Sequence, residues 1–154
     1  MAEPVSVTTH IAAAPEVVYD LVSDLPRMGE WSPENTGGRW VGGATGPAVG
    51  ARFRGSNRKG WRRWSTSVTV ADATPGRAFA FDVTAGPMKV ARWSYAIEPA
   101  GDGCDVTESW EDHRNPAIAR IVGPVTGVSD RRSHNEATMR TTLERLKAAA
   151  EAGG

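Results

Sequence analysis

The C-terminal stretch 128–150 constrains the fold more than any other part of the sequence. It contains no Gly or Pro, and Ser129 or Asp130 can cap its start by accepting hydrogen bonds from free backbone N–H groups. We therefore predict one long helix, the longest that the chain can form. Its apolar side chains recur at helical spacing on one face, which the rest of the chain must cover. These side chains are Val128, Met139, Leu143, Leu146 and Ala150.

The first half of this predicted helix is polar on the same face. Arg132, Asn135 and Glu136 precede Met139 there. We interpret the apolar C-terminal half as the anchor and the polar half as lying near an opening. The three polar side chains then either rim an entrance or form a solvated helix face.

The chain before this helix has mostly the period-two alternation that is typical of strands. A strand is predicted over 5–11, a helix over 15–22 that begins at Pro15, and a second helical turn over 25–31. Another helical turn is predicted at 117–122, and Gly- and Pro-containing turns separate the remaining strands. These strands are predicted at 40–41, 51–57, 61–71, 79–83, 93–97 and 106–110.

This order of elements predicts one α+β domain over residues 1–154. Hairpin-length turns make the last six strands antiparallel neighbours. Only the C-terminal helix is long enough to cover the apolar face of the resulting seven-stranded sheet. Because sheets twist, a sheet that curls around one helix leaves a space between them.

The element order and several stretches resemble the START-like helix-grip superfamily (SRPBCC), and within it the bacterial polyketide cyclase/dehydrase branch. The resemblance implies a curled antiparallel sheet gripping the C-terminal helix, with two short helices between the first two strands. It also implies an internal cavity for hydrophobic or amphipathic molecules, and some members guide cyclisation and dehydration of polyketide chains. The matching stretches are 11–24, 28–32, 50–55, 74–81 and 93–99.

Large aromatic side chains dominate the predicted inward faces. They either fill the core or line a ligand pocket, because small-molecule sites are commonly aromatic with a few placed polar groups. Together with three helix residues they form the candidate ligand-binding set. This set is Trp31, Trp64, Phe79, Phe81, Trp93, Trp110, Asn135, Met139 and Leu143.

Arg62, Tyr95 and Glu108 are the candidate catalytic residues. Arg62 and Glu108 fall on inward faces, so we expect them to pair, to bind a ligand group or to lie at the cavity mouth. A register one residue different would place both in water instead. Tyr95 either donates a proton or hydrogen bond to a carbonyl, or satisfies its hydroxyl locally.

Several function classes are disfavoured by composition. The formal net charge is zero, so the basic and aromatic cluster between Arg52 and Trp64 does not predict nucleic-acid binding. His10, His113 and His134 lack metal-ligand spacing and Cys104 is the only cysteine, so we expect neither a metal site nor another cofactor. No signal peptide or membrane span is recognisable, and we expect a cytoplasmic monomer or homodimer.

Three functions remain open at this stage. The first is binding of a hydrophobic or aromatic small molecule between sheet and helix. The second is a polyketide cyclase/dehydratase-like enzyme that uses Arg62, Tyr95 and Glu108 on a carbonyl substrate. The third is a non-catalytic interaction or stress-response module with a filled core. Convergence of the polar side chains favours the enzyme, and interlocked Trp64, Trp93 and Trp110 rings favour the filled core.

Overall fold

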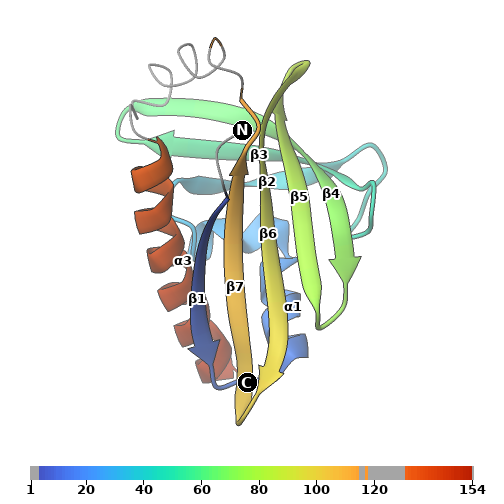
Figure 1. Cartoon of the computed structure of the whole chain (residues 1–154). Coiled ribbons are helices and arrows are strands. Elements are labelled where there is room, and N and C mark those ends of the chain that lie inside the picture. The colour runs from blue at the N-terminus through green and yellow to red at the C-terminus, as the bar shows by residue number, and fades with distance from the viewer. Residues whose placement is uncertain (1–3, 115–116, 118–130, 154) are drawn as a thin grey trace.

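The computed structural model describes residues 4–114, 117 and 131–153 of the 154-residue chain. A curled antiparallel sheet wraps around a long helix, and two short helices follow the first strand (Figure 1). The helices are α1 (Pro15–Val22), the 3₁₀ helix η1 (Leu25–Glu30) and α3 (Arg131–Gly153). The strands are β1 (Val5–Ile11), β2 (Asn35–Val41), β3 (Arg52–Lys59), β4 (Arg62–Thr74), β5 (Ala78–Ala85), β6 (Met88–Ala100) and β7 (Gly103–Asp112).

All seven strands form one sheet in the order β1-β7-β6-β5-β4-β3-β2, and every pair is antiparallel. Figure 1 shows β2 and β3 running across the ends of the long strands, with β4 bending from one direction to the other. The ladder shifts register in β4 between Val70 and Asp72, and in β5 between Val83 and Thr84. Such irregularities bend strands and increase their twist, which closes the sheet around the helix.

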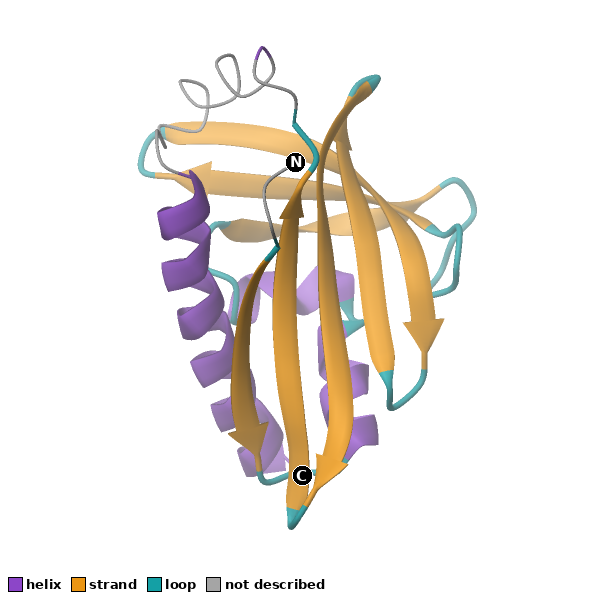
Figure 2. Cartoon of the chain, viewed as in Figure 1, coloured by secondary structure: helices purple, strands orange, loops and turns teal. Residues whose placement is uncertain are grey.

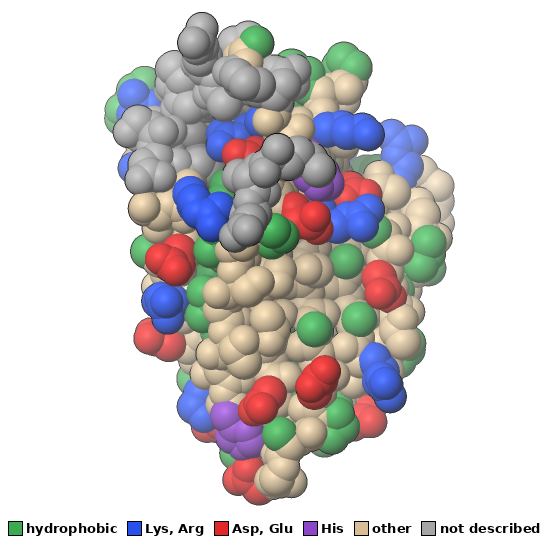
Figure 3. Space-filling view, viewed as in Figure 1, with side chains coloured by type: hydrophobic (Ala, Val, Ile, Leu, Met, Phe, Trp, Pro, Cys, Tyr) green, Lys and Arg blue, Asp and Glu red, His purple; other side chains and the backbone are tan. Residues whose placement is uncertain are grey.

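The alternation in β1 places its apolar side chains inside and its hydroxyl side chains outside. Val5, Val7 and Ile11 are buried. On the outer face Ser6 and Thr8 form cross-strand hydrogen bonds of 2.8 Å with Ser109 and Thr107 of β7. Figure 3 shows this face as a largely uncharged surface over β1 and β7, with charged side chains mostly around its margin. This pattern fixes which side of the sheet faces α3.

The predicted face of the C-terminal helix is confirmed over the residues that the structure describes. Met139, Leu143, Leu146 and Ala150 are each no more than 1% exposed. Helix α3 lies alongside β1, as Figure 2 shows, and also contacts α1. Val128, the caps at Ser129 and Asp130, and the helical turn at 117–122, apart from Ala117, lie outside the described residues. No helix in the described part of the chain is long and apolar enough to cross a bilayer.

The two short helices match the predicted positions, and α1 has the predicted bounds. Val18 and Val22 of α1 are buried, as is Leu25 at the start of η1. Both helices have Pro at one of their first two positions, where the missing N–H costs no hydrogen bond. They close one end of the curled sheet, so the packed core lies between them, β5–β7 and the second half of α3.

Strand β2 is longer than the two residues predicted for it. It begins at Asn35 and includes Gly37 and Gly38, a pair that local propensity places in a loop. Gly38 pairs with Gly55 of β3, and a side chain at Gly38 would overlap the carbonyl oxygen of Arg54 and the ring of Phe53. Gly38 thus allows the backbones of β2 and β3 to approach closely, a tertiary requirement that residue preference does not reveal.

Candidate functional site

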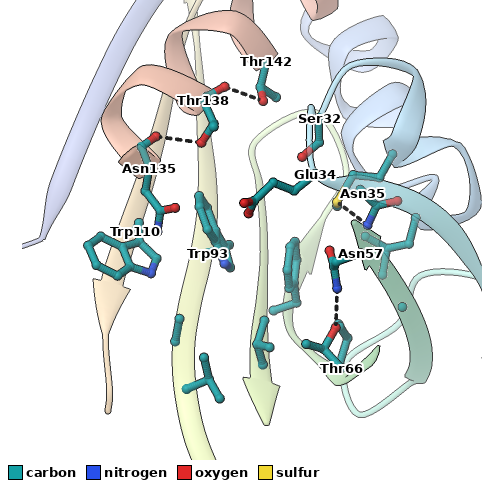
Figure 4. Close-up of a pocket in the computed structure, with 18 of the residues that line it drawn as sticks. Ser32, Glu34, Asn35, Asn57, Thr66, Trp93, Trp110, Asn135, Thr138 and Thr142 are labelled. Atoms are coloured by element: carbon teal, nitrogen blue, oxygen red, sulfur yellow. Dashed lines mark hydrogen bonds between the residues drawn. The ribbon is translucent and has the colours of Figure 1, made fainter. Parts of the chain in front are cut away.

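An inner pocket of about 150 Å³ lies between the sheet and the first half of α3 (Figure 4). Side chains from η1, β2–β7 and α3 line it, and they include both aromatic rings and polar groups. Its lining residues are Leu25, Met28, Ser32, Glu34, Asn35, Phe53, Gly55, Asn57, Trp64, Thr66, Val68, Phe81, Val83, Val90, Ala91, Trp93, Tyr95, Glu108, Trp110, Arg114, Asn135, Thr138, Met139 and Thr142.

One wall of the inner pocket is aromatic. Trp93 of β6 and Trp110 of β7 are cross-strand neighbours whose ring centroids lie 6.4 Å apart at an interplanar angle of 40°. Phe81 of β5 is the partner of Trp93 on its other side, and Trp64 of β4 also lines the pocket. Strand alternation brings these rings to one face because each lies at an inward position of its strand. Flat apolar surfaces of this kind suit aromatic or alicyclic groups.

Helix α3 covers this wall with polar side chains at helical spacing. Asn135, Thr138 and Thr142 line the pocket, and Figure 4 shows Asn135 extending toward Trp93 and Trp110. The Thr142 hydroxyl donates to the carbonyl oxygen of Thr138 over 2.8 Å, and the Thr138 hydroxyl donates to that of Asn135 over 3.0 Å. These threonine hydroxyls use their protons within the helix, so they present mainly acceptor capacity and methyl groups.

The opposite side of the pocket carries a second polar group of residues. The Asn57 side-chain amide donates to the hydroxyl of Thr66 over 3.4 Å, between paired strands β3 and β4. Asn35 at the start of β2 directs its amide to the sulfur of Met28 over 3.7 Å, while its oxygen accepts from the N–H of Gly37 at 2.8 Å. The pocket therefore has one aromatic wall and one mixed polar wall.

Tyr95 and Glu108 form a buried, hydrogen-bonded pair next to the aromatic wall. They are cross-strand partners on β6 and β7, and the Tyr95 hydroxyl donates to Oε2 of Glu108 over 3.0 Å. Glu108 is only 3% exposed. Its second oxygen, Oε1, is buried and has no hydrogen-bond partner in the described structure. An unpaired buried carboxyl oxygen is costly, and such groups call for a functional explanation.

Burial decides the protonation state of this pair. It raises the pKa of Glu108 to about 8, although the hydrogen bond from Tyr95 acts in the opposite direction. Burial, followed by the neighbouring Glu108 carboxyl, raises the pKa of Tyr95 well above its usual value. At neutral pH Glu108 is therefore mainly a neutral carboxylic acid, which can donate as well as accept a hydrogen bond.

Two hydrogen-bonded side-chain pairs border the pocket. His134 of α3 lies with Nε2 2.9 Å from Oε2 of Glu34, which precedes β2. This contact joins the first half of the helix to the η1–β2 segment. Beyond β7, Arg114 forms hydrogen bonds of 2.9 Å from Nε and from one terminal nitrogen to the two carboxylate oxygens of Asp112. Burial opposes ionisation of Asp112, but the hydrogen bonds from Arg114 lower the pKa of its carboxyl.

The structure brings most of the sequence-predicted residues to the inner pocket. Glu108 and Tyr95 face inward, so the predicted strand register is confirmed for both. The candidate residues that line the pocket are Trp64, Phe81, Trp93, Tyr95, Glu108, Trp110, Asn135 and Met139. Arg132 and Glu136, which share their helix face with Asn135 in the sequence pattern, are exposed.

Four predicted residues lie elsewhere. Arg62 is at the start of β4, where its guanidinium stacks 4.4 Å from the ring of Trp61, and it neither lines the pocket nor pairs with Glu108. Phe79 packs edge-on against Tyr19 of α1 at 6.3 Å in the core. Trp31 and Leu143 are buried without lining the pocket. Phe79 and Leu143 are thus buried as predicted, but at positions along β5 and α3 that do not reach the pocket.

Sequence reasoning missed several lining residues for identifiable reasons. Asn57 lies on the same face of β3 as Phe53, so the alternation already contained that signal. Asn35 lies in the part of β2 that residue preferences do not predict as a strand. Glu34 and Arg114 lie outside regular strands, where periodicity carries no information. His134 contacts the lining residue Glu34 without lining the pocket itself, and no sequence spacing indicates that contact. No group of three or more potential metal ligands occurs among the described residues.

Comparison with known proteins identifies the family. The family model for polyketide cyclase/dehydrase and lipid transport matches residues 3–151. A polyketide-cyclase-like protein from Corynebacterium glutamicum, Cgl2372, is 34% identical, with 99% of this chain and 95% of that chain covered and a TM-score of 0.66. No match was found among the curated proteins.

Two more distant structures share the fold. The di-domain ARO/CYC StfQ from the steffimycin biosynthetic pathway is 17% identical, with a TM-score of 0.75 over 98% of this chain and 52% of that one. The major latex-like protein 151 from Panax ginseng is 14% identical, with a TM-score of 0.72 over 96% of this chain and 97% of that one. The match over residues 3–151 shows that this chain belongs to the polyketide cyclase/dehydrase and lipid transport family.

Proposed function

We propose that this protein binds a hydrophobic or aromatic small molecule in the inner pocket. The observation that carries the proposal is the pocket itself, about 150 Å³ bounded by Trp64, Phe81, Trp93 and Trp110 and covered by α3. An apolar cavity of about this volume holds a molecule the size of benzene. The polar groups opposite the rings supply the few oriented contacts that such sites use for specificity.

A cavity-filling variant and a matched control test this proposal. Ala91 of β6 is buried and lines the pocket, whereas Ala96 on the same strand is exposed. We expect α-methylstyrene, a compact aromatic hydrocarbon, to bind the wild type in a calorimetric titration. Ala91→Leu should weaken binding at least tenfold because the added methyl groups occupy the ligand space, and Ala96→Leu should not. Absence of binding by the wild type to a panel of one-ring hydrocarbons would refute the proposal.

A second candidate function is catalysis of a cyclase or dehydratase kind on a carbonyl substrate. The Tyr95–Glu108 pair favours it, because a neutral buried acid beside a phenol can protonate a carbonyl oxygen. The description of the family as polyketide cyclase/dehydrase and lipid transport, and the likeness to the ARO/CYC protein StfQ of steffimycin biosynthesis, also support a catalytic function. In this proposal Glu108 and Tyr95 touch the substrate, while Arg62, some distance from the pair, has no direct part.

Mass spectrometry distinguishes catalysis from binding. A poly-β-ketone that loses water on cyclising is incubated with wild type, Glu108→Gln and Arg62→Gln proteins. Catalysis predicts faster water loss with wild type and Arg62→Gln than with Glu108→Gln. Equal rates for all three, matching the protein-free control, would leave binding as the function.

A further inference from the structure

The unpaired oxygen of Glu108 has a chemical consequence for what the inner pocket accepts. Oε2 already accepts the hydrogen bond from Tyr95, whereas Oε1 is buried without a partner in the described structure. Glu108 and Tyr95 both line the pocket. A guest in that pocket can supply the missing hydrogen-bond partner of Oε1.

The identity of that guest follows from which oxygen carries the proton. Burial raises the pKa of Glu108 to about 8, so the carboxyl is neutral near pH 7. Because Oε2 accepts from Tyr95, the acid proton belongs on Oε1. Oε1–H then needs an acceptor, and a carbonyl oxygen of an uncharged ligand supplies one at normal hydrogen-bond distance.

Carboxylate ligands are disfavoured by the charges around the pocket. The titratable residues among the described lining residues are Glu34, Tyr95, Glu108 and Arg114, with His134 bound to Glu34 from α3. The one guanidinium there, of Arg114, already holds Asp112 through two hydrogen bonds and has a side chain only 9% exposed. A buried anion next to Glu108 would lack a free counter-charge among the described lining residues, and an uncompensated buried charge is expensive.

We propose that Glu108 is the specificity-determining residue of the inner pocket, and that its Oε1 selects uncharged carbonyl compounds of about one ring over carboxylates of the same shape. The inference rests on the proposed binding function and adds a chemical class to it. Tyr95 acts as a positioning residue, because its hydroxyl occupies Oε2 and directs the acid proton toward the ligand.

Three nearly isosteric probes separate the inference from the binding function itself. α-Methylstyrene, acetophenone and benzoate share a phenyl ring and differ in carrying a methylene, a carbonyl oxygen or a carboxylate. Calorimetry at pH 6.5 should give acetophenone at least tenfold tighter binding than benzoate. Binding of the hydrocarbon alone tests the pocket, and the ranking of the ketone against the other probes tests Glu108.

Variants assign the ranking to one side chain. In Glu108→Leu, the ratio of ketone to hydrocarbon affinity should fall about fivefold, the value of one ordinary hydrogen bond. Glu108→Gln keeps the shape and offers an N–H in place of the acid proton, so it should retain most of the ratio. Thr107→Val is the control, since that hydroxyl lies on the outer face of β7, where it pairs with Thr8, and its removal should leave the ratio unchanged.

The pH dependence of acetophenone binding tests the role of Glu108 even if the Glu108→Leu variant fails to fold. Raising the pH from 6.5 to 9.5 should weaken acetophenone binding to the wild type several-fold and leave Glu108→Gln almost unaffected. Benzoate binding as tight as acetophenone, or an unchanged ketone ratio in Glu108→Leu with the hydrocarbon still bound, would overturn the inference but not the pocket. Failure of every probe to bind would remove the binding function and this inference together.

Discussion

Tyr95 and Glu108 lie directly opposite each other on β6 and β7, and a hydrogen bond of 3.0 Å joins the tyrosine hydroxyl to the glutamate Oε2. The alternation that turns Trp93 and Trp110 toward the pocket also buries this pair, because all four positions share one face of neighbouring strands. A sheet that needs only a core would place apolar residues here. Burying the carboxyl of Glu108 therefore lowers the stability of the fold, and this cost can be measured.

The stability of the protein should depend on pH through Glu108. Its pKa is about 8 in the folded state, against 4.5 as the ordinary value, so the folded protein holds the proton more tightly. The corresponding stability is fully present below pH 4.5 and is lost as the pH rises to about 8, at up to about 1.4 kcal/mol per pH unit. In urea unfolding, the free energy of unfolding of Glu108→Gln should rise relative to that of the wild type as the pH increases across this range. Glu98→Gln, at an exposed position on β6, should follow the wild type.

Removing the tyrosine hydroxyl should also destabilise the protein. In Tyr95→Phe, Oε2 of Glu108 loses its donor and both oxygens of a buried acid become unpaired, at a cost of about 1–3 kcal/mol. A double-mutant cycle with Glu108→Leu isolates the pair, because Leu has no oxygen left to satisfy. We expect Tyr95→Phe to cost less in the Glu108→Leu background. Equal costs in both backgrounds would show that the two side chains do not interact.

The contact between His134 and Glu34 should govern how fast ligand enters and leaves. Their 2.9 Å contact ties the first half of α3 to the η1–β2 segment, and Glu34 lines the inner pocket. His134→Ala should change stability by less than about 1 kcal/mol, since partly exposed pairs contribute little. It should nevertheless raise the dissociation rate of a bound hydrocarbon several-fold, as measured by NMR exchange. Arg140→Ala, which removes an exposed contact with Glu136 within α3, should leave that rate unchanged.

Two buried residues of α3 should respond differently to truncation. Leu146 lies in the packed core and Met139 lines the inner pocket, and both are completely buried. Leu146→Ala should destabilise by about 2–5 kcal/mol through lost contacts and a residual void. Met139→Ala should also destabilise, but it enlarges the pocket and should admit two-ring hydrocarbons more readily than the wild type. Thermal unfolding measures the stability of both variants, and calorimetry with naphthalene measures their binding. Equal naphthalene affinity for Leu146→Ala and Met139→Ala would contradict the prediction.

Much of the fold was predictable because its signals are local and periodic. β1 and α1 have the predicted bounds, and the inward positions of β4–β7 follow from alternation alone. β2 was largely missed because Gly38 is required there by close packing against β3, and Gly37 by a positive φ of 111°, neither of which a local pattern encodes. Periodicity thus reveals which face a residue occupies.

The candidate site was only partly predictable because depth along a strand is a tertiary property. Phe79 and Phe81 share one face of β5, yet Phe79 packs on Tyr19 of α1 while Phe81 lines the pocket. Arg62 is on the predicted side of β4 but stacks on Trp61 at the hairpin end. Which side chain reaches the pocket depends on where the sheet bends and which helix covers it. Neither is written in the spacing of apolar residues.

The indole N–H signals offer the most direct test of the account. The chain has six Trp residues, and of these Trp64, Trp93 and Trp110 line the inner pocket, whereas Trp61 is 79% exposed. In a two-dimensional ¹H–¹⁵N titration with acetophenone, the signals of the three lining residues should shift together and saturate at one dissociation constant. Those of Trp31, Trp40 and Trp61 should stay nearly fixed. Shifts confined to Trp61, or no saturable shift at any indole, would contradict a ligand site inside the sheet.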